Sequence, residues 1–163
     1  MAADLTRIEI SRNVDIVGTK LAVTLFVIDH SKARRATCVR LLQSQREMRV
    51  IGESQSAAET ISFISKVKPN IVLLDLDLAL ESGQLLQILR RESPRTKVIL
   101  LTGAVSQARI LKSLSYGVLG CIKNRDLASF LTTAVRVVDA GEAWVPRSLV
   151  SKILEQINKR LQQ

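Results

Sequence analysis

The chain is poor in the residues that most often build metal centres, disulfide frameworks and covalent catalysts. Among its 163 residues there are two cysteines and one histidine. Cys38 and Cys121 are too few for a disulfide framework and fit a reducing cytosol. The sequence has no catalytic triad motif, no glycine-rich phosphate loop and no Cys/His cluster at metal-ligand spacing. We therefore expect a protein that is not an enzyme.

Aromatic residues and long apolar runs are also scarce. Aromatic side chains make up 3% of the chain and hydrophobic residues 47%, so the core must consist of Leu, Ile and Val. No apolar stretch approaches the ~20 residues that a membrane-spanning helix needs. The first residues include Asp4, Arg7 and Glu9, where a signal peptide would be apolar. We therefore expect a cytoplasmic protein without a membrane partner.

Negative charge is in the minority, with a formal net charge of +9. The basic excess lies in residues 21–50 and 105–163. Such an excess favours contact with nucleic acid or another anionic surface, although solvated helix faces explain it more simply. No aromatic residues alternate with the basic ones, which argues against a stacking platform for single-stranded nucleic acid.

The chain does contain a regular alternation of short apolar runs and segments with helical periodicity. The expected strands are 21–28, 48–52, 71–77, 97–101 and 118–122. The expected helices are 31–45, 57–67, 106–115, 126–140, a segment from the Ser82-Gly83 break to residue 91, and a last one from residue 146. This order predicts an α/β fold of the (βα)5 type, a doubly wound five-stranded parallel sheet with an extra C-terminal helix. We divide the chain into an N-terminal arm (1–20), a main domain (21–141) and a C-terminal linker or dimerisation helix (142–163).

Polar residues follow three of the expected strands. In open parallel sheets, binding residues collect where the strands end. Asp29 follows the first strand, Asp75 the third and Thr102 the fourth. Two carboxylates and a hydroxyl at one edge could bind a hard cation such as Mg²⁺, and a carboxylate can act as a nucleophile toward a phosphoryl group. The alternative is that Asp75 only caps a loop, as carboxylates at strand ends often do.

Six short motifs between residues 21 and 155 support the first interpretation. They are Val27-Ile28-Asp29-His30, Val50-Ile51-Gly52-Glu53, Pro69-Asn70-Ile71-Val72-Leu73-Leu74-Asp75-Leu76, Leu100-Leu101-Thr102-Gly103, Gly117-Val118-Leu119-Gly120 and Gly141-Glu142-Ala143-Trp144-Val145-Pro146. None is specific alone, but their order and spacing together resemble the receiver domain of two-component response regulators, of the kind that precedes a LuxR-type helix-turn-helix. The resemblance implies a CheY-like, flavodoxin-like fold.

The resemblance also implies roles for individual residues. Asp75 would be the phosphoacceptor, Asp29 a metal-binding acid, and Thr102 the switch hydroxyl that contacts the acyl phosphate. Mg²⁺ would be the cofactor and a sensor histidine kinase a possible partner. DNA would be contacted only through a separate or missing helix-turn-helix domain.

The sequence departs from the resembled pattern on the acidic side of the site. Ile28 stands where the first of two adjacent acids is usual, so one metal-binding carboxylate is missing. Leu78-Ala79 replaces the usual Met-Pro. Asp77 could supply some of the lost negative charge beside Asp29 and Asp75, or it could be a solvent-facing loop acid whose backbone carbonyl contacts the metal. We therefore expect weak or absent Mg²⁺ binding.

A further departure concerns the lysine that normally follows the fifth strand and pairs with the phosphoryl group. Counting from Gly120 places Asn124 at this position and Cys121 at the usual aromatic switch position. Alternatively, Lys123 serves through a shifted loop. The first alignment is the one we favour, and it leaves the site without its usual ammonium group.

Five further residues near these motifs receive simple interpretations. His30 is expected to be a loop or cap residue rather than a metal ligand, because no second His or Cys is placed to help it. Arg34 and Arg35 are expected to face solvent. Cys38 and Cys121 are expected to be buried core thiols.

The last helix carries an aliphatic stripe at helical spacing. The stripe consists of Leu149, Val150, Ile153, Leu154, Ile157 and Leu161. It must be buried on its own domain or against a second copy, and we expect a homodimer. Two functions stay open: an atypical receiver that is phosphorylated weakly at Asp75, and a phosphorylation-independent pseudo-receiver that acts as a constitutive interaction or dimerisation module.

Overall fold

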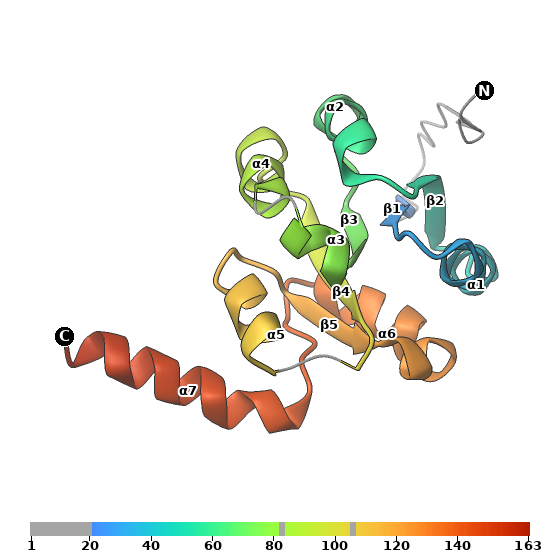
Figure 1. Ribbon diagram of the computed structural model, residues 1–163. Coiled ribbons are helices and arrows are strands. Elements are labelled where there is room, and N and C mark those ends of the chain that lie inside the picture. The colour runs from blue at the N-terminus through green and yellow to red at the C-terminus, as the bar shows by residue number, and fades with distance from the viewer. Residues whose placement is uncertain (1–20, 82–83, 105–106) are drawn as a thin grey trace.

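Five aliphatic strands form one parallel sheet with the order β2-β1-β3-β4-β5, covered by helices on both faces (Figure 1). The computed structural model describes residues 21–81, 84–104 and 107–163. The strands are β1 (Val23–Ile28), β2 (Met48–Ser54), β3 (Ile71–Asp75), β4 (Lys97–Thr102) and β5 (Gly120–Lys123). The helices are α1 (Lys32–Gln43), α2 (Ala57–Val67), α3 (Leu76–Glu81), α4 (Leu85–Glu92), α5 (Gln107–Leu114), the 3-10 helix η1 (Asn124–Asp126), α6 (Leu127–Asp139) and α7 (Arg147–Leu161). The predicted doubly wound fold with an extra C-terminal helix is confirmed.

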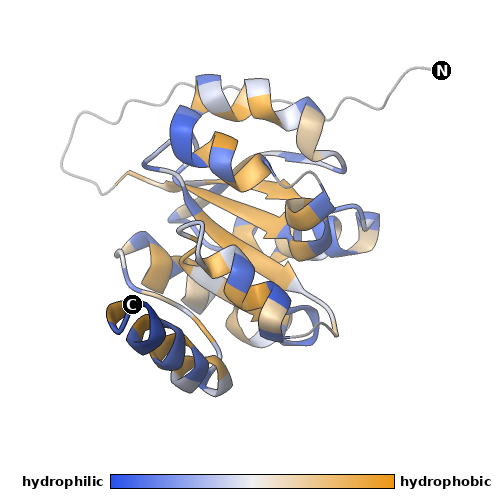
Figure 2. Cartoon of the chain, turned by 60° about the vertical axis from the view of Figure 1, so that its left-hand side comes forward, coloured by the Kyte–Doolittle hydropathy of each residue, from blue (hydrophilic) through white to orange (hydrophobic). Residues whose placement is uncertain are grey.

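The sheet separates two aliphatic layers, because successive side chains of a strand point to opposite faces. In β3, Ile71 and Leu73 pack with α1 and α6, whereas Val72 and Leu74 pack with α2, α3, α4 and α5. All four side chains are completely buried. Figure 2 shows the strands as a hydrophobic layer between helices that carry both hydrophilic and hydrophobic residues. The central strand β3 is apolar up to Asp75 because both faces of the sheet are covered there.

Local signals in the sequence set several helix ends. The Ser31 side chain accepts a hydrogen bond from the backbone N–H of Arg34 (3.3 Å) and caps α1. Gly141 has a φ of +89°, a conformation that favours glycine, and it ends α6. Pro146 directly precedes α7. Most predicted ends lie within two residues of the observed ones.

The structure corrects two predicted strand boundaries, the end of β3 and the start of β5. β3 ends at Asp75, and the short helix α3 begins at once at Leu76, where the sequence analysis extended the strand to Asp77. A helix of six residues is too short to show a helical period, so it was missed. β5 begins at Gly120, two residues later than predicted.

Some expectations fall outside the described residues. The N-terminal arm (1–20), the Ser82-Gly83 break and the first residue of the predicted 106–115 helix belong to this group. Among the helices that the structure describes, none combines the length and the apolar character that crossing a membrane would require.

Candidate functional site

Two carboxylates lie side by side at the carboxyl ends of the central strands. In the parallel pairing of β1 with β3, Ile28 lies opposite Leu74, so Asp29 and Asp75 come directly after paired residues. Asp29 is fully buried and Asp75 is 4% exposed. Ligand atoms of Asp29, His30 and Asp75 all lie within 4.8 Å of one another. The predicted grouping of Asp29 with Asp75 is confirmed.

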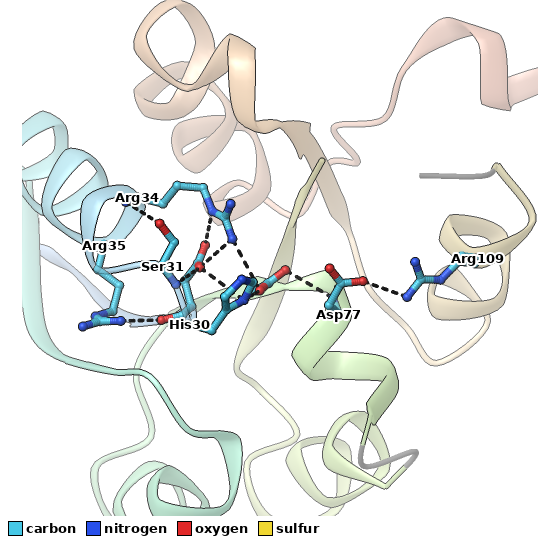
Figure 3. Close-up of polar contacts among 8 residues, drawn as sticks. His30, Ser31, Arg34, Arg35, Asp77 and Arg109 are labelled. Carbon is cyan, nitrogen blue, oxygen red and sulfur yellow. Dashed lines mark hydrogen bonds and ion pairs between the residues drawn. The ribbon is translucent and has the colours of Figure 1, made fainter. Parts of the chain in front are cut away.

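Arg34 places a guanidinium group against the carboxylates of Asp29 and Asp75, and Figure 3 shows Arg34 among these contacts. Its Nε donates to Oδ2 of Asp29 and its Nη2 donates to Oδ1 of Asp29, both at 2.8 Å. The same Nη2 lies 3.5 Å from Oδ2 of Asp75. The hydrogen bonds to Asp29 raise the pKa of Arg34. Burial acts in the opposite direction, and the negative charges of Asp29, Asp75 and Asp77 add to the rise.

The expectation that Arg34 and Arg35 face solvent is therefore wrong. Arg34 lies in the first turn of α1 and its side chain is 28% exposed. The Arg35 side chain is 11% exposed, donates to the backbone carbonyl of Asp29 (2.6 Å), and forms an ion pair with Glu53 of β2 (3.4 Å). A buried carboxylate requires a nearby partner for its charge, and the first turn of α1 supplies one.

His30 lies in the loop after β1, as predicted, but its ring has a further contact that the sequence analysis missed. Its Nδ1 contacts Oδ2 of Asp75. The ring is half-exposed, whereas the carboxylate that it contacts is buried. The signal that could have indicated this contact is the position of His30 directly after Asp29 at a strand end.

Asp77 belongs to a separate ion pair. Its backbone N–H donates to Oδ1 of Asp75 (3.2 Å), while its carboxylate accepts a hydrogen bond from Nη2 of Arg109 in α5 (2.8 Å). Both side chains of this pair are about half-exposed. Asp77 therefore lies in the first turn of α3 with its carboxylate bound to Arg109, and it is not one of the three grouped ligands.

Thr102 ends β4 at the same edge, but its hydroxyl is bonded to the neighbouring strand. The side chain is 1% exposed, and its Oγ1 donates to the backbone carbonyl of Ile122 (3.3 Å). The thiol of Cys121 donates to the same Oγ1 at 3.9 Å. Burial raises the pKa of the Cys121 thiol, while the bond to Thr102 and the charge of Lys123 act against that rise. Cys38 is also buried, as predicted, and burial raises its pKa to about 12.

The structure distinguishes Lys123 from Asn124. Lys123 is the last residue of β5, lies opposite Thr102, and lines a surface hollow together with Phe130 and Trp144. Asn124 begins η1, and its Nδ2 lies 3.8 Å from the point where a Cβ on Gly103 would be, beside the end of β4. Its Oδ1 is buried without a hydrogen-bond partner. Neither residue forms a hydrogen bond or an ion pair with Asp75.

The residues at this edge do not fit a divalent cation as they stand. Both carboxylate oxygens of Asp29 accept hydrogen bonds from Arg34, and Oδ1 also accepts one from the backbone N–H of Ser31 (2.8 Å). Ile28, where the resembled family has an acid, is fully buried. Mg²⁺ requires open oxygen ligands in octahedral geometry, and here the guanidinium already binds the fully buried carboxylate.

Comparison with known proteins shows the family of the chain. The profile of the response regulator receiver domain matches residues 25–136. The chain belongs to this family. The resemblance seen in the sequence motifs is thereby confirmed.

Proteins similar to this chain are also response regulators. The chain is 27% identical over 137 residues to the response regulator protein VraR of Staphylococcus aureus (strain Mu3 / ATCC 700698), an alignment that covers 83% of this chain and 65% of the relative. In fold it resembles a two-component response regulator of the LuxR family from Aurantimonas sp. SI85-9A1, with a TM-score of 0.73 and 20% identity over 83% of this chain and 97% of that one. It also resembles the isolated receiver (REC) domain of RcsB from Salmonella enterica serovar Typhimurium, with a TM-score of 0.72 and 19% identity over 82% and 98% of the two chains. This receiver-domain chain thus spans about two thirds of the length of the curated relative.

Proposed function

We propose that this receiver domain is an atypical one, in which Asp75 is the candidate phosphoacceptor and the output is a change in dimerisation or partner contacts. The observation that carries the proposal is the position of Asp75. It ends the central strand β3, is 4% exposed, and lies next to the Asp29 carboxylate. A carboxylate at this point can accept a phosphoryl group on one of its oxygens. The chain itself is not proposed to be an enzyme.

Three features support weak phosphorylation. Arg34 holds Asp29, Ile28 supplies no second acid, and Asn124 brings no ammonium group to the phosphoryl oxygens. Charge that develops in the transition state would be poorly neutralised, an effect commonly worth a few kcal/mol. Weak or absent Mg²⁺ binding is part of the same proposal.

A second candidate function is a pseudo-receiver that never carries a phosphoryl group. The observation in its favour is that both oxygens of Asp75 already have partners. Oδ2 contacts His30, and Oδ1 accepts from the backbone N–H of Asp77. In this case the domain would act as a constitutive interaction or dimerisation module.

Membership of the family supports a proposal for the partners. We propose a homodimer, with a sensor histidine kinase as the phosphoryl donor if Asp75 is phosphorylated. Any contact with DNA is proposed to occur through a helix-turn-helix domain separate from this receiver domain. The two buried, unpaired cysteines are compatible with the reducing cytosol that we propose as its location.

The deciding experiment is phosphorylation by acetyl phosphate in the presence of Mg²⁺, followed by intact-mass measurement. Slow, partial labelling that disappears in Asp75→Asn is the expected result. A matched control is Asp77→Asn, which changes an acid outside the buried pair and should still be labelled. A complete lack of labelling, in a protein that still dimerises, would favour the pseudo-receiver over the phosphorylated one.

A further inference from the structure

We propose that Arg34 is the resident cation of this site, and that a divalent metal ion binds the Asp29–Asp75 pair only when the Arg34 guanidinium leaves it. The inference rests on the proposed assignment of Asp75 and Asp29 as the site. It adds an internal competitor for the cation, contributed by the first turn of α1. The relevant ligand class is a divalent cation with oxygen preference, Mg²⁺ or Mn²⁺.

The contacts of Asp29 carry the argument. Its carboxylate is fully buried and accepts two hydrogen bonds from one guanidinium, Nε to Oδ2 and Nη2 to Oδ1, each at 2.8 Å (Figure 3). Bidentate, charge-assisted bonds of this length are among the strong polar contacts in proteins. A metal ion at Asp29 would compete with the guanidinium for the same two oxygens. The guanidinium is therefore a direct competitor and not merely a distant positive charge.

The contact with Asp75 extends the competition to the second carboxylate. Nη2 of Arg34 lies 3.5 Å from Oδ2 of Asp75, so one guanidinium faces both acids. A cation that bridges the two carboxylates would lie in the same region. His30 contacts the same Oδ2 and further restricts access to it.

The charge balance explains why an arginine can take this role here. With Ile28 in place of an acid, the buried edge carries two carboxylates instead of three. One guanidinium then neutralises half of the buried negative charge. Two other arginines of the described residues near this edge have different partners: Arg35 binds a backbone carbonyl and Glu53, and Arg109 binds Asp77.

The test is a Mn²⁺ titration followed by electron paramagnetic resonance of free Mn²⁺, on the full chain and without any phosphoryl donor. The unaltered protein should bind Mn²⁺ weakly, and Arg34→Ala should bind it at least tenfold more tightly. Arg34→Gln is the second variant, because its amide can still donate one hydrogen bond to Asp29 and so preserve packing. The matched control is Arg40→Ala, which removes an equal charge from the exposed side of the same helix and should behave like the unaltered protein.

Two results would overturn the proposal. One is Mn²⁺ affinity of the unaltered protein equal, within twofold, to that of folded Arg34→Ala or Arg34→Gln. The other is a gain in affinity that persists when Asp29→Asn is added to either variant, since the metal would then bind elsewhere.

A third measurement observes Arg34 itself in the unaltered protein. The Nε–H resonance of Arg34 in the unaltered protein should be protected from solvent exchange by Asp29, and should resist broadening by Mn²⁺ at concentrations that saturate Arg34→Gln. Broadening of that resonance at low Mn²⁺ would contradict the proposal. Because no phosphoryl donor is present, these outcomes are independent of whether Asp75 can be phosphorylated.

Discussion

The two halves of the sheet edge differ in how their polar groups are satisfied. On the β1–β3 side, the carboxylates of Asp29 and Asp75 are bonded to Arg34 and His30. On the β4–β5 side, the partners are neutral: the Thr102 hydroxyl binds a backbone carbonyl, and Oδ1 of Asn124 has no partner. The comparison shows that positive charge reaches this edge from the first turn of α1, where a typical member of the family brings it from the end of β5.

The difference has energetic consequences that can be tested. A buried carboxylate that loses its partner is left uncompensated, and this is expensive. A neutral amide that has no partner gains little from being polar, so its removal should be tolerated. Substitutions on the β1–β3 side of the edge should therefore have larger effects on stability than substitutions on the β4–β5 side.

The largest expected effect is on the charged half. Arg34→Ala removes both hydrogen bonds to the fully buried Asp29 carboxylate. Breaking a buried pair typically costs about 3–5 kcal/mol, and because Arg34 is partly exposed we expect the lower end, about 3 kcal/mol. Urea unfolding without divalent ions measures this loss. Arg40→Ala should stay within about 0.5 kcal/mol of the unaltered protein, and an equally small loss for Arg34→Ala would show that the ion pair contributes nothing to stability.

The next effect concerns α7, which packs on α5 beside the β4–β5 half and extends away from the sheet (Figure 1). Its aliphatic stripe divides into two rows. Leu149 is buried in the core and Ile153 packs against it. The second row remains exposed and consists of Val150 (43%), Leu154 (55%), Ile157 (47%) and Leu161 (79%).

Successive steps of 4, 3 and 4 residues along the exposed row match a heptad seam. We therefore expect dimerisation through α7. The double substitution Leu154→Glu with Ile157→Glu should weaken it at least about tenfold, equivalent to about 1.4 kcal/mol. Light scattering across a concentration series is the measurement. These substitutions are preferable to truncation after Arg147, which would also remove Leu149 from the core.

The matched control for α7 is Ser148→Glu with Gln162→Glu, which adds the same two charges at exposed positions outside the seam, one near each end of α7. It should dimerise like the unaltered protein. If the unaltered protein is monomeric at tens of micromolar, the homodimer is wrong. If the dimer survives the seam substitutions, the interface is the face of α5, β5 and α6 instead.

A smaller effect, on phosphorylation, is expected from adding the acid and the lysine that the sequence lacks, one on each side of the edge. Ile28→Asp with Asn124→Lys adds an acid to one half and an ammonium group to the other. Phosphorylation by acetyl phosphate should rise about fivefold, or ~1 kcal/mol in the activation barrier, a small gain because Arg34 still holds Asp29. The same pair of substitutions in an Asp75→Asn background is the control and should show no labelling. Efficient labelling of the unaltered protein, unchanged by these substitutions, would contradict the idea of a weakened site.

For the β1–β3 side of the edge, the sequence predicted the strands and the position of the two acids, but it did not predict which side chains bind these acids. The apolar runs predicted the strands, and strand ends placed Asp29 and Asp75 together because parallel neighbours end at one edge. The partners of these acids were missed, since the direction of the Arg34 side chain depends on how α1 lies against the sheet. On the β4–β5 side, the spacing of the sequence left Lys123 and Asn124 as alternatives for the position of the usual lysine. The observed end of β5 at Lys123 is what places Asn124 beside Gly103.

The smallest effect is expected from the neutral half. Asn124→Ala deletes a buried carbonyl oxygen that has no hydrogen-bond partner, and it also gives up the packing of the amide, whose Nδ2 lies 3.8 Å from the point where a Cβ on Gly103 would be. An unsatisfied buried acceptor costs about 1–3 kcal/mol, so its removal should offset the lost packing and leave the free energy of unfolding within about 0.5 kcal/mol. The matched control is Asn70→Ala, because Oδ1 of Asn70 accepts hydrogen bonds from the backbone N–H (2.8 Å) and the hydroxyl (2.9 Å) of Thr24. That variant should lose about 1–2 kcal/mol in urea unfolding. Equal losses in the free energy of unfolding for the two variants would mean that the Asn124 side chain is as well hydrogen-bonded as that of Asn70. The two sides of the edge would then differ only in the charge of their polar groups.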